Sequence, residues 1–347
     1  MSGGSGQTIR VAIAGCGAIS RAHLKAIAEA RPGDGVGVTV SGVFDQDAAR
    51  AAERAREFGV ERVYGSWDDV LGDAAADVVA VLLPHDVHAR FAIAALDAGH
   101  HVVVEKPMAT SIADCDAMIA AARRAGKRLH PVHNRVYDPA SEAAQTFLAD
   151  GAIGEVFLAQ TVGLEPPQTV SVRPWLGTPA GGGGVLLAQA VHPAYVLRWL
   201  LGDVDSVACI TTARNVVEMT AEDTAVALLR FRSGAVGEMT GTFGLRAGPY
   251  EHGITLYGPE GFVEIHSRRG VTGISPQRFG DRTPHPLLED PGWGSGFRRL
   301  WEDYARGFAT GAPTRVTDED GKRAVEIILA GYLAARESKT VSLPLEA

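Results

Sequence analysis

A glycine turn, Gly15-Cys16-Gly17, lies between an apolar run and a helix-forming stretch, and it constrains the fold more than any other feature. The run before it, Ile9–Ala14, has the β-branched and small apolar residues of a buried strand. In a strand-turn-helix unit, the first glycine permits a tight turn and the second lets the backbone approach a ligand closely. The pattern therefore predicts the first βα unit of a parallel sheet.

Residues 9–132 alternate short apolar runs with Ala-rich stretches, as in repeated βα units. The expected strands are Ile9–Ala14, Val38–Phe44, Val78–Leu82 and His101–Glu105. The expected helices are Ala18–Ala30, Asp47–Phe58, Val87–Ala98 and Ile112–Ala125, with Gly59, Gly99 and Gly126 at their C-terminal caps. The prediction is an α/β Rossmann domain with a doubly wound parallel sheet.

The second part of the chain, 133–347, has strand-like runs joined by short Gly-containing turns, which favours an α+β domain with an open, mostly antiparallel sheet. A Leu-rich helix is expected to end before Gly202, and two more are expected at Phe297–Thr310 and Asp318–Glu337, the last capped by Thr317 and Asp320. We expect Arg268–Gly296 to be an irregular loop because it is rich in Gly and Pro. The expected strands are Val156–Leu164, Val204–Thr212, Thr224–Arg232, Ala235–Phe243, Ile254–Tyr257 and Phe262–His266.

Composition narrows the class of protein. A chain of 347 residues exceeds what one hydrophobic core usually serves, so two domains are expected after a flexible leader at 1–8. The net charge of −8 disfavours nucleic-acid binding and favours small-molecule partners. Three widely spaced cysteines suggest neither disulfides nor a zinc site. We expect no membrane span and a cytoplasmic location, because the apolar runs are broken by Gly, Pro or charge.

The glycine turn predicts a site for a dinucleotide pyrophosphate. Gly15 and Gly17 allow close approach, and the N–H groups at Ala18 and Ile19 begin a helix that attracts negative charge. Asp45 ends the second strand, where a carboxylate accepts both adenosine ribose hydroxyls and repels a 2′-phosphate, so NAD is expected rather than NADP. The alternative is that Asp45 caps the next helix, with Asp47 as competitor.

The motif Glu105-Lys106-Pro107 ends the fourth strand, at the edge where doubly wound sheets bind their ligands. A lysine there can hydrogen-bond the substrate oxygen on the carbon that exchanges hydride with a nicotinamide. The alternative for Lys106 is a solvated strand end.

Together these motifs resemble the glucose-fructose oxidoreductase, inositol dehydrogenase and rhizopine-catabolism family, called Gfo/Idh/MocA. The resemblance covers nearly the whole chain. It rests on the glycine turn and on Leu83-Pro84, His88, the Ala95–Gly99 helix end, Glu105-Lys106-Pro107, Asn134-Arg135, Gly154-Glu155-Val156, Gly182–Leu187, His192 and the Val325–Arg336 helix.

The resemblance implies a function and residue roles. The expected activity is NAD-dependent hydride transfer at a hydroxyl or keto carbon of a sugar, polyol or inositol, in a homodimer or homotetramer. Lys106 and His192 become catalytic candidates, with His192 as general base. The remaining candidates are Pro84, His85, His88, Glu105 and Lys106 for the cofactor, and Lys106, Asn134, Arg135, Glu165, Arg173, Trp175 and His192 for the substrate.

The chain departs from the family pattern beside His192. Many members have an Asp four residues earlier, where this chain has Ala188, and a frequent Asp three residues later is replaced by Tyr195. A different acid/base arrangement is therefore expected, either His192 with Tyr195 or recruitment of Glu165 or His133.

Two other functions stay open from the sequence. One is an enzyme that keeps NAD bound through a closed redox cycle while it eliminates a group or cleaves a glycoside. The other is a regulator that senses a dinucleotide or sugar without turnover. No metal site is expected, since the pairs His85/His88 and His130/His133 lack a third ligand of suitable spacing.

Overall fold

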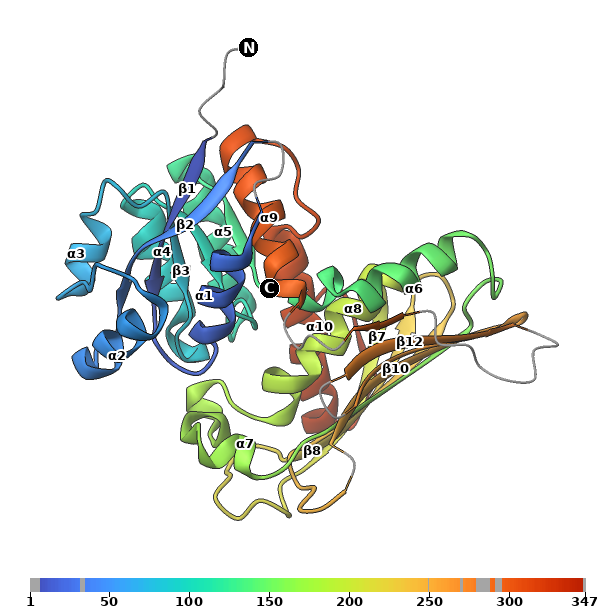
Figure 1. Ribbon diagram of the computed structural model, residues 1–347. Coiled ribbons are helices and arrows are strands. Elements are labelled where there is room, and N and C mark those ends of the chain that lie inside the picture. The colour runs from blue at the N-terminus through green and yellow to red at the C-terminus, as the bar shows by residue number, and fades with distance from the viewer. Residues whose placement is uncertain are drawn as a thin grey trace, which may run out of the picture. The chain divides into compact units, whose positions relative to one another are not determined.

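The computed structural model describes residues 7–31, 35–248, 250–268, 271–278, 288–290 and 295–345. The chain forms two compact units (Figure 1). The first comprises Met1–Asn134 and Gly294–Lys322, and the second comprises Arg135–Trp293 and Arg323–Ala347.

The first unit contains a parallel five-stranded sheet in the order β2-β1-β3-β4-β5. All residues of β3 are buried, as expected of a central strand covered on both faces. The predicted Rossmann sheet is confirmed. Its strands are β1 (Thr8–Ala14), β2 (Gly37–Phe44), β3 (Val78–Val81), β4 (His101–Val104) and β5 (Leu129–Pro131).

The helices of the first unit follow the strands as predicted. Gly59 and Gly126 adopt left-handed conformations at the C-caps of α2 and α5, which is why glycine ends these helices. The sequence analysis did not predict α3, a single turn capped by Ser66. The helices are α1 (Ser20–Glu29), α2 (Ala48–Phe58), α3 (Trp67–Leu71), α4 (His88–Asp97) and α5 (Ile112–Ala125).

Helix α9 (Ser295–Thr310) also belongs to the first unit, where it lies beside α1 (Figure 1). It buries Leu300 and Trp301 completely, and this apolar face holds the segment against the Rossmann sheet. The structure thus differs from the expected division at 132/133, which gave all of 133–347 to the second domain. The expected leader is also shorter, since Thr8 already lies in β1, and residues 1–6 lie outside the described residues.

The second unit contains a nine-stranded sheet in the order β13-β12-β11-β10-β6-β9-β8-β7-β14. Among the strands in the described residues, only the β6–β9 pair of this sheet is parallel, so the predicted open, mostly antiparallel sheet is confirmed. The strands are β6 (Leu158–Leu164), β7 (Val204–Thr212), β8 (Thr224–Phe231), β9 (Val236–Thr242), β10 (Glu251–Gly258), β11 (Gly261–Arg268), β12 (Val271–Arg278), β13 (Leu288–Asp290) and β14 (Val341–Ser342).

The expected loop at Arg268–Gly296 is wrong in part. Residues Val271–Arg278 form β12, which pairs along its whole length with β11, and β13 pairs with β12 in turn. Backbone hydrogen bonding to an existing strand edge outweighs the Gly and Pro content of this stretch. Residues 269–270, 279–287 and 291–294 of the expected loop lie outside the described residues.

The helices of the second unit are α6 (Pro139–Ala149), α7 (Gln168–Ser171) and α8 (Val191–Leu201), while α10 (Asp318–Glu337) begins in the first unit and continues into the second. Thr317 and Asp320 form the predicted capping box of α10, with each side chain accepting the other's backbone N–H. Contrary to the expectation from broken apolar runs, Pro179–Leu201 is long and apolar enough to span a membrane. Its most apolar part is 72% buried, as in the core helix of a soluble protein.

Buried histidines give the first unit a predictable response to acid. His130 of β5 stacks on Tyr304 with ring centroids 4.5 Å apart, and burial lowers its pKa to about 3. Because an unfolded histidine titrates near pH 6.5, the unfolded chain binds more protons between about pH 3 and 6.5. Stability therefore falls as pH falls through this range, by about 1.4 kcal/mol per pH unit for this one group.

We expect His130→Phe, which keeps an aromatic ring on Tyr304 but cannot titrate, to flatten this dependence by about one proton. Urea unfolding of the wild type and the variant at several pH values between about 4.5 and 7 measures the slope. Parallel slopes for the two proteins would contradict the assignment.

Candidate active site

Adjacent strands of the first unit deliver the predicted cofactor residues to one edge of the sheet. Gly15 follows β1, Asp45 follows β2, Pro84 closely follows β3 and Glu105 follows β4. Because these strands are parallel, all their carboxyl ends lie at the same edge. This edge is the candidate cofactor site.

The glycine turn has the geometry that a dinucleotide requires. Gly15 has φ +104°, and a Cβ there would overlap the carbonyl of Leu82, so only glycine fits. A Cβ on Gly17 would meet nothing within 4 Å, so this side of the turn is open to close approach. These observations support the roles predicted for both glycines.

A buried arginine braces the turn from helix α2. The Ser20 hydroxyl donates to the Gly17 carbonyl at 2.7 Å, and Arg54 donates from Nε to Ser20 Oγ at 3.0 Å and from Nη2 to the Cys16 carbonyl at 3.1 Å. The Arg54 side chain is only 4% exposed. The sequence analysis missed Arg54, because it looks like any other arginine of an amphipathic helix.

Asp45 belongs to the glycine turn and does not cap α2. Its Oδ2 accepts the Cys16 N–H at 2.9 Å and its Oδ1 accepts the Asp47 N–H at 2.9 Å, whereas Asp47 caps α2 by accepting from the N–H groups of Ala49 and Arg50. A carboxylate has about four acceptor positions, so Asp45 keeps capacity for ribose hydroxyls. Together with the glycine turn, this donor and acceptor set fits NAD.

Lys106 lies at the end of β4, half-buried, as predicted. Its backbone N–H donates to Oε2 of the buried Glu105 at 3.0 Å, and the Lys106–Pro107 peptide bond is cis. Glu105 therefore fixes the backbone of Lys106, while its predicted contact with the cofactor stays a prediction. Pro84 is half-buried and His85 is 5% exposed, next to the carboxyl end of β3.

His88 is not the cofactor contact that the sequence analysis expected. The side chain is completely buried, and its Nδ1 and Nε2 lie 2.9 Å and 2.8 Å from the carbonyl oxygens of Pro107 and Leu83. Burial lowers the pKa of His88, although the two carbonyls oppose this effect. His88 instead connects the segment after β3, through Leu83, with the segment after β4, through Pro107.

In the second unit, His192 has a tyrosine partner. Its Nδ1 lies 2.8 Å from the Tyr195 hydroxyl oxygen, and that oxygen also accepts the Arg135 N–H at 3.2 Å. The structure thereby supports the predicted pairing of His192 with Tyr195. Arg135 serves this group through its backbone, and its predicted substrate contact stays a prediction.

A π-helical turn, η5 (Leu186–Ala190), leads directly into α8 and His192. Single π turns occur often at functional sites. Ala188, where the family often has Asp, lies within this turn and is 8% exposed. The π geometry departs from the regular i, i+4 spacing, so a helical-wheel argument from Ala188 to His192 does not hold.

Three polar side chains of the second unit form a connected group that the sequence analysis found only in part. Gln189 Nε2 lies 3.1 Å from His252 Nδ1, and His252 Nε2 lies 3.3 Å from Glu165 Oε1. Gln189 fits there because Gly163 and Gly241 lack side chains, and a Cβ on either would overlap its amide. No spacing or motif distinguishes His252 in the sequence, since strand pairing alone brings it to Glu165.

Glu222 fixes the start of the π turn. Its Oε1 accepts the Leu186 N–H at 2.9 Å and the Tyr332 hydroxyl at 2.9 Å. Burial raises the pKa of Glu222. The turn that precedes His192 is therefore anchored to helix α10.

The other predicted site residues lie in several places. Asn134 ends the first unit, and His133, the alternative partner for His192, is a buried residue (2% exposed) of the same unit. Arg173 is exposed and precedes the short helical segment Pro174–Gly177, which contains the half-buried Trp175. The substrate roles of Asn134, Arg173 and Trp175 stay predictions.

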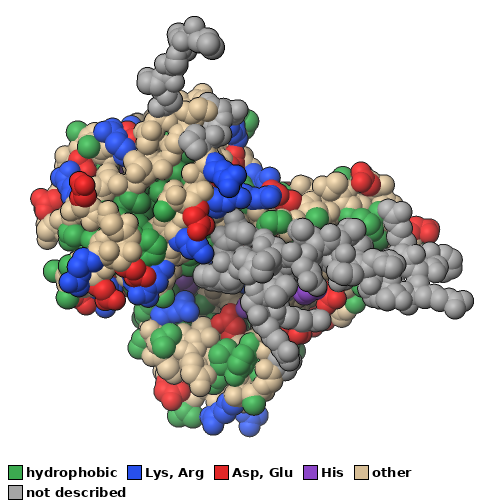
Figure 2. Space-filling model, viewed as in Figure 1, with side chains coloured by type: hydrophobic (Ala, Val, Ile, Leu, Met, Phe, Trp, Pro, Cys, Tyr) green, Lys and Arg blue, Asp and Glu red, His purple; other side chains and the backbone are tan. Residues whose placement is uncertain are grey.

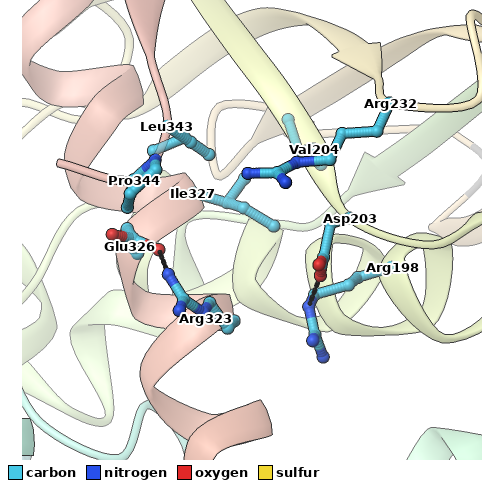
Figure 3. A pocket seen from close by; sticks show the side chains of 9 residues that line it. All are labelled: Arg198, Asp203, Val204, Arg232, Arg323, Glu326, Ile327, Leu343 and Pro344. Atoms are coloured by element: carbon cyan, nitrogen blue, oxygen red, sulfur yellow. Dashed lines mark hydrogen bonds and ion pairs between the residues drawn. The ribbon is translucent and has the colours of Figure 1, made fainter.

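The second unit also has a cavity of about 150 Å³ (Figure 3). Among its lining arginines, Arg198 pairs with Asp203 and Arg323 with Glu326. None of the predicted site residues lines it.

Within the described part of the chain, no three His, Cys, Asp or Glu side chains form a group able to hold a metal ion. Acidic and basic side chains are intermixed over the visible face of the first unit (Figure 2).

Comparison with known proteins gives this architecture a family. Residues 9–133 match the oxidoreductase family domain described as an NAD-binding Rossmann fold, and residues 141–264 match the GFO/IDH/MocA C-terminal domain. A D-apiose dehydrogenase of Paraburkholderia graminis is 28% identical, covering 96% of this chain and 89% of that protein. A myo-inositol 2-dehydrogenase of Thermotoga maritima is 26% identical, covering 96% and 98%.

Solved structures agree with these matches. The WlbA dehydrogenase of Bordetella pertussis, solved with NADH and UDP-GlcNAcA, has a TM-score of 0.84 and 27% identity, covering 98% of this chain and 99% of that one. Two consecutive domain matches, full-length relatives and a dinucleotide-compatible strand edge lead to one conclusion. The chain belongs to the Gfo/Idh/MocA family of NAD-dependent oxidoreductases, which act on sugars and polyols.

Proposed function

We propose that this enzyme transfers a hydride between NAD and a carbinol or keto carbon of a polyhydroxylated small molecule, a sugar, polyol or cyclitol. The observation that carries the proposal is the His192–Tyr195 hydrogen bond of 2.8 Å, because it orients an imidazole that can move a proton. The names of the relatives, an apiose and an inositol dehydrogenase, support this substrate class.

In the proposed mechanism, the cofactor transfers the hydride and a side chain of the protein transfers the proton. NAD, when bound, accepts or returns the hydride. Lys106 holds the substrate oxygen by a hydrogen bond from its ammonium group. When His192 donates from Nδ1 to the Tyr195 oxygen, its Nε2 keeps a lone pair and accepts the hydroxyl proton during oxidation. In reduction, the same nitrogen returns that proton to the alkoxide oxygen.

The neutral tyrosine partner has a chemical consequence. A carboxylate beside an imidazole favours the charged imidazolium, whereas a phenol orients the ring without adding a negative charge. Tyr195 can do so because its oxygen accepts the Arg135 N–H, which fixes its position. We therefore assign Tyr195 an orienting role and His192 the proton transfer.

A screen of polyols, cyclitols and keto sugars with NAD or NADH tests the proposal by NADH absorbance. With the substrate so found, we expect His192→Ala to lower kcat by about 10² or more. Tyr195→Phe should lower kcat by about tenfold with little change in KM, as for the loss of one orienting hydrogen bond. Tyr257→Phe, which removes a hydroxyl elsewhere on the sheet, is the control and should keep wild-type kcat.

The same screen distinguishes the other candidate functions. Product formation without NADH accumulation, with NAD retained, would replace the proposal by a closed redox cycle. Tight NAD binding with no turnover on any substrate would favour a sensor. Near-wild-type turnover of His192→Ala would remove His192 from the mechanism.

We propose that Asp45 sets the preference for NAD over NADP. Asp45→Ala should weaken NAD binding by about tenfold, because it removes a charged acceptor of hydrogen bonds, and should narrow the difference between NAD and NADP. Ser66→Ala is the control, since it removes the cap of α3, costs about 1 kcal/mol of stability and leaves that difference unchanged. Calorimetric titration with both coenzymes measures the effect, and equal changes in the two variants would contradict the assignment.

We also propose that the exposed face of the large sheet binds a second copy of the chain. Ile210, Val226, Leu228 and Val236 are 77%, 38%, 58% and 43% exposed, and Ile210 lies directly opposite Val226 on the neighbouring strand. Leu228 lies opposite Glu238, and Val236 lies opposite Arg230, so these apolar side chains lie among polar ones on the face. Such a mixture of apolar and polar side chains is typical of a protein contact surface. The expected assembly is a homodimer or homotetramer.

Leu228→Asp should convert that assembly into monomers, because it places a charge inside an apolar contact. Light scattering after gel filtration measures the mass. Val217→Asp is the control, since Val217 is 86% exposed but lies between β7 and β8 in the sequence, outside these strands. A wild type that is monomeric at all concentrations would overturn this proposal.

We place the enzyme in the cytoplasm, as the composition suggested. Its three cysteines are buried free thiols, which suits a reducing compartment.

A further inference from the structure

We propose that His23 of helix α1 is a positioning residue for Lys106, and that Trp301 of helix α9 sets the tautomer in which His23 acts. The proposal rests on the role proposed above for Lys106. The group consists of Trp301, His23 and Glu105, and all three side chains belong to the first unit.

The donor and the acceptor of each hydrogen bond in this group can be assigned. Trp301 Nε1 lies 3.1 Å from His23 Nδ1, and an indole N–H can only donate, so Nδ1 of His23 accepts. The proton of the neutral imidazole therefore lies on Nε2, which donates to Glu105 Oε1 at 3.0 Å. Glu105 Oε2 accepts the N–H of Lys106 at 3.0 Å. The chain of bonds thus begins in α9 and ends on the backbone of Lys106.

The three side chains of this group are buried, so each lost hydrogen bond is costly. Trp301 and His23 are 0% exposed and Glu105 is 6% exposed, so water cannot replace a lost partner. The His23 ring also packs edge-on against Phe297 and Trp301, with centroids 4.8 Å and 5.9 Å away. Each donor in this series of hydrogen bonds has one acceptor, and the His23 ring cannot rotate without losing both of its hydrogen bonds.

The arrangement is specific to the end of β4 that carries Lys106. At the start of the same strand, His100 is also buried (5% exposed), but its ring nitrogens face only the carbonyls of Ala76 and Leu71. His100 therefore provides structure without a link to Lys106. It offers a matched control for substitution of a buried histidine.

The chain of bonds also explains why α9 matters to a site built by residues 15–106. Residues Gly294–Lys322 return to the first unit after the chain has formed Arg135–Trp293 of the second unit. Trp301 is the residue of this segment that donates a hydrogen bond to His23, 278 positions earlier. The returning segment thereby contributes to the orientation of Lys106 in addition to covering the sheet.

Four variants of the full chain test the proposal by kcat, KM, NAD affinity and melting temperature. His23→Leu should lower kcat by about tenfold or more while KM and the Kd for NAD change less than about twofold. His23→Gln, whose amide can accept from Trp301 and donate to Glu105, should return kcat to within about threefold of the wild type. Trp301→Phe, which keeps an aromatic ring but removes the N–H donor and part of the buried ring volume, should lie between these two. His100→Leu should lose thermal stability and keep kcat.

A double-mutant cycle separates positioning from general stability. In a Lys106→Ala background, His23→Leu should cause no further loss of residual turnover, because its effect acts through Lys106. Additive losses, equal effects of His23→Leu and His100→Leu on kcat, or failure of His23→Gln to restore kcat would overturn the proposal. If His23→Leu does not fold, the kcat values of Trp301→Phe and His23→Gln still test whether the hydrogen bonds of His23 affect Lys106.

Two readouts do not depend on turnover. Nitrogen-15 NMR of the histidine rings should show His23 neutral with its proton on Nε2. The carbon-13 signal of reductively methylated Lys106, identified by its loss in Lys106→Ala, should shift in Trp301→Phe and not in His100→Leu. If no substrate is turned over, the proposed function fails while these signals still test the link. An Nδ1-protonated His23 or an unshifted Lys106 signal would overturn the inference alone.

Discussion

Parallel pairing of five strands is the constraint on which the candidate cofactor site depends. Parallel strands place their carboxyl ends at one edge, so residues from 15 to 106 in the sequence meet there. Each position then needs only local chemistry. A glycine provides the turn after β1, a carboxylate ends β2, and a lysine follows β4.

The glycine turn and Asp45 form one unit. The Cys16 N–H donates to Asp45, and the side chain of Arg54 donates to the Cys16 carbonyl, so the same peptide segment is fixed from two directions. A backbone that is held in this way loses little further freedom when a ligand binds, which favours tight binding. The glycine turn, the predicted site of the pyrophosphate, is therefore held in place by helix α2 as well as by the glycines.

In the second unit, His192 lacks the neighbouring carboxylate that is frequent in the family. Tyr195 provides a neutral hydrogen-bond partner, and Glu165 pairs with His252 instead. The π turn before His192 contributes to this outcome because it directs Gln189 toward His252 and holds Ala188 in an irregular register. Titratable groups are thus present in the unit, but they are distributed differently from the family pattern.

The sequence by itself determined the alternation of strands and helices in the first unit, the Rossmann glycine turn, and the places of Asp45 and Lys106 at strand ends, because each rests on neighbours a few residues apart or on a motif. It left Tyr195, Glu165 and His133 as alternative partners of His192, and only the structure shows Tyr195 beside it. Only the tertiary structure decided that His88 is buried between two carbonyls, that β12 extends the large sheet, and that α9 joins the first unit. It also decided that Arg54, His252 and Trp301 take part. These outcomes depend on contacts between residues tens to hundreds of positions apart, and no local periodicity or spacing encodes which partner a buried polar side chain will find.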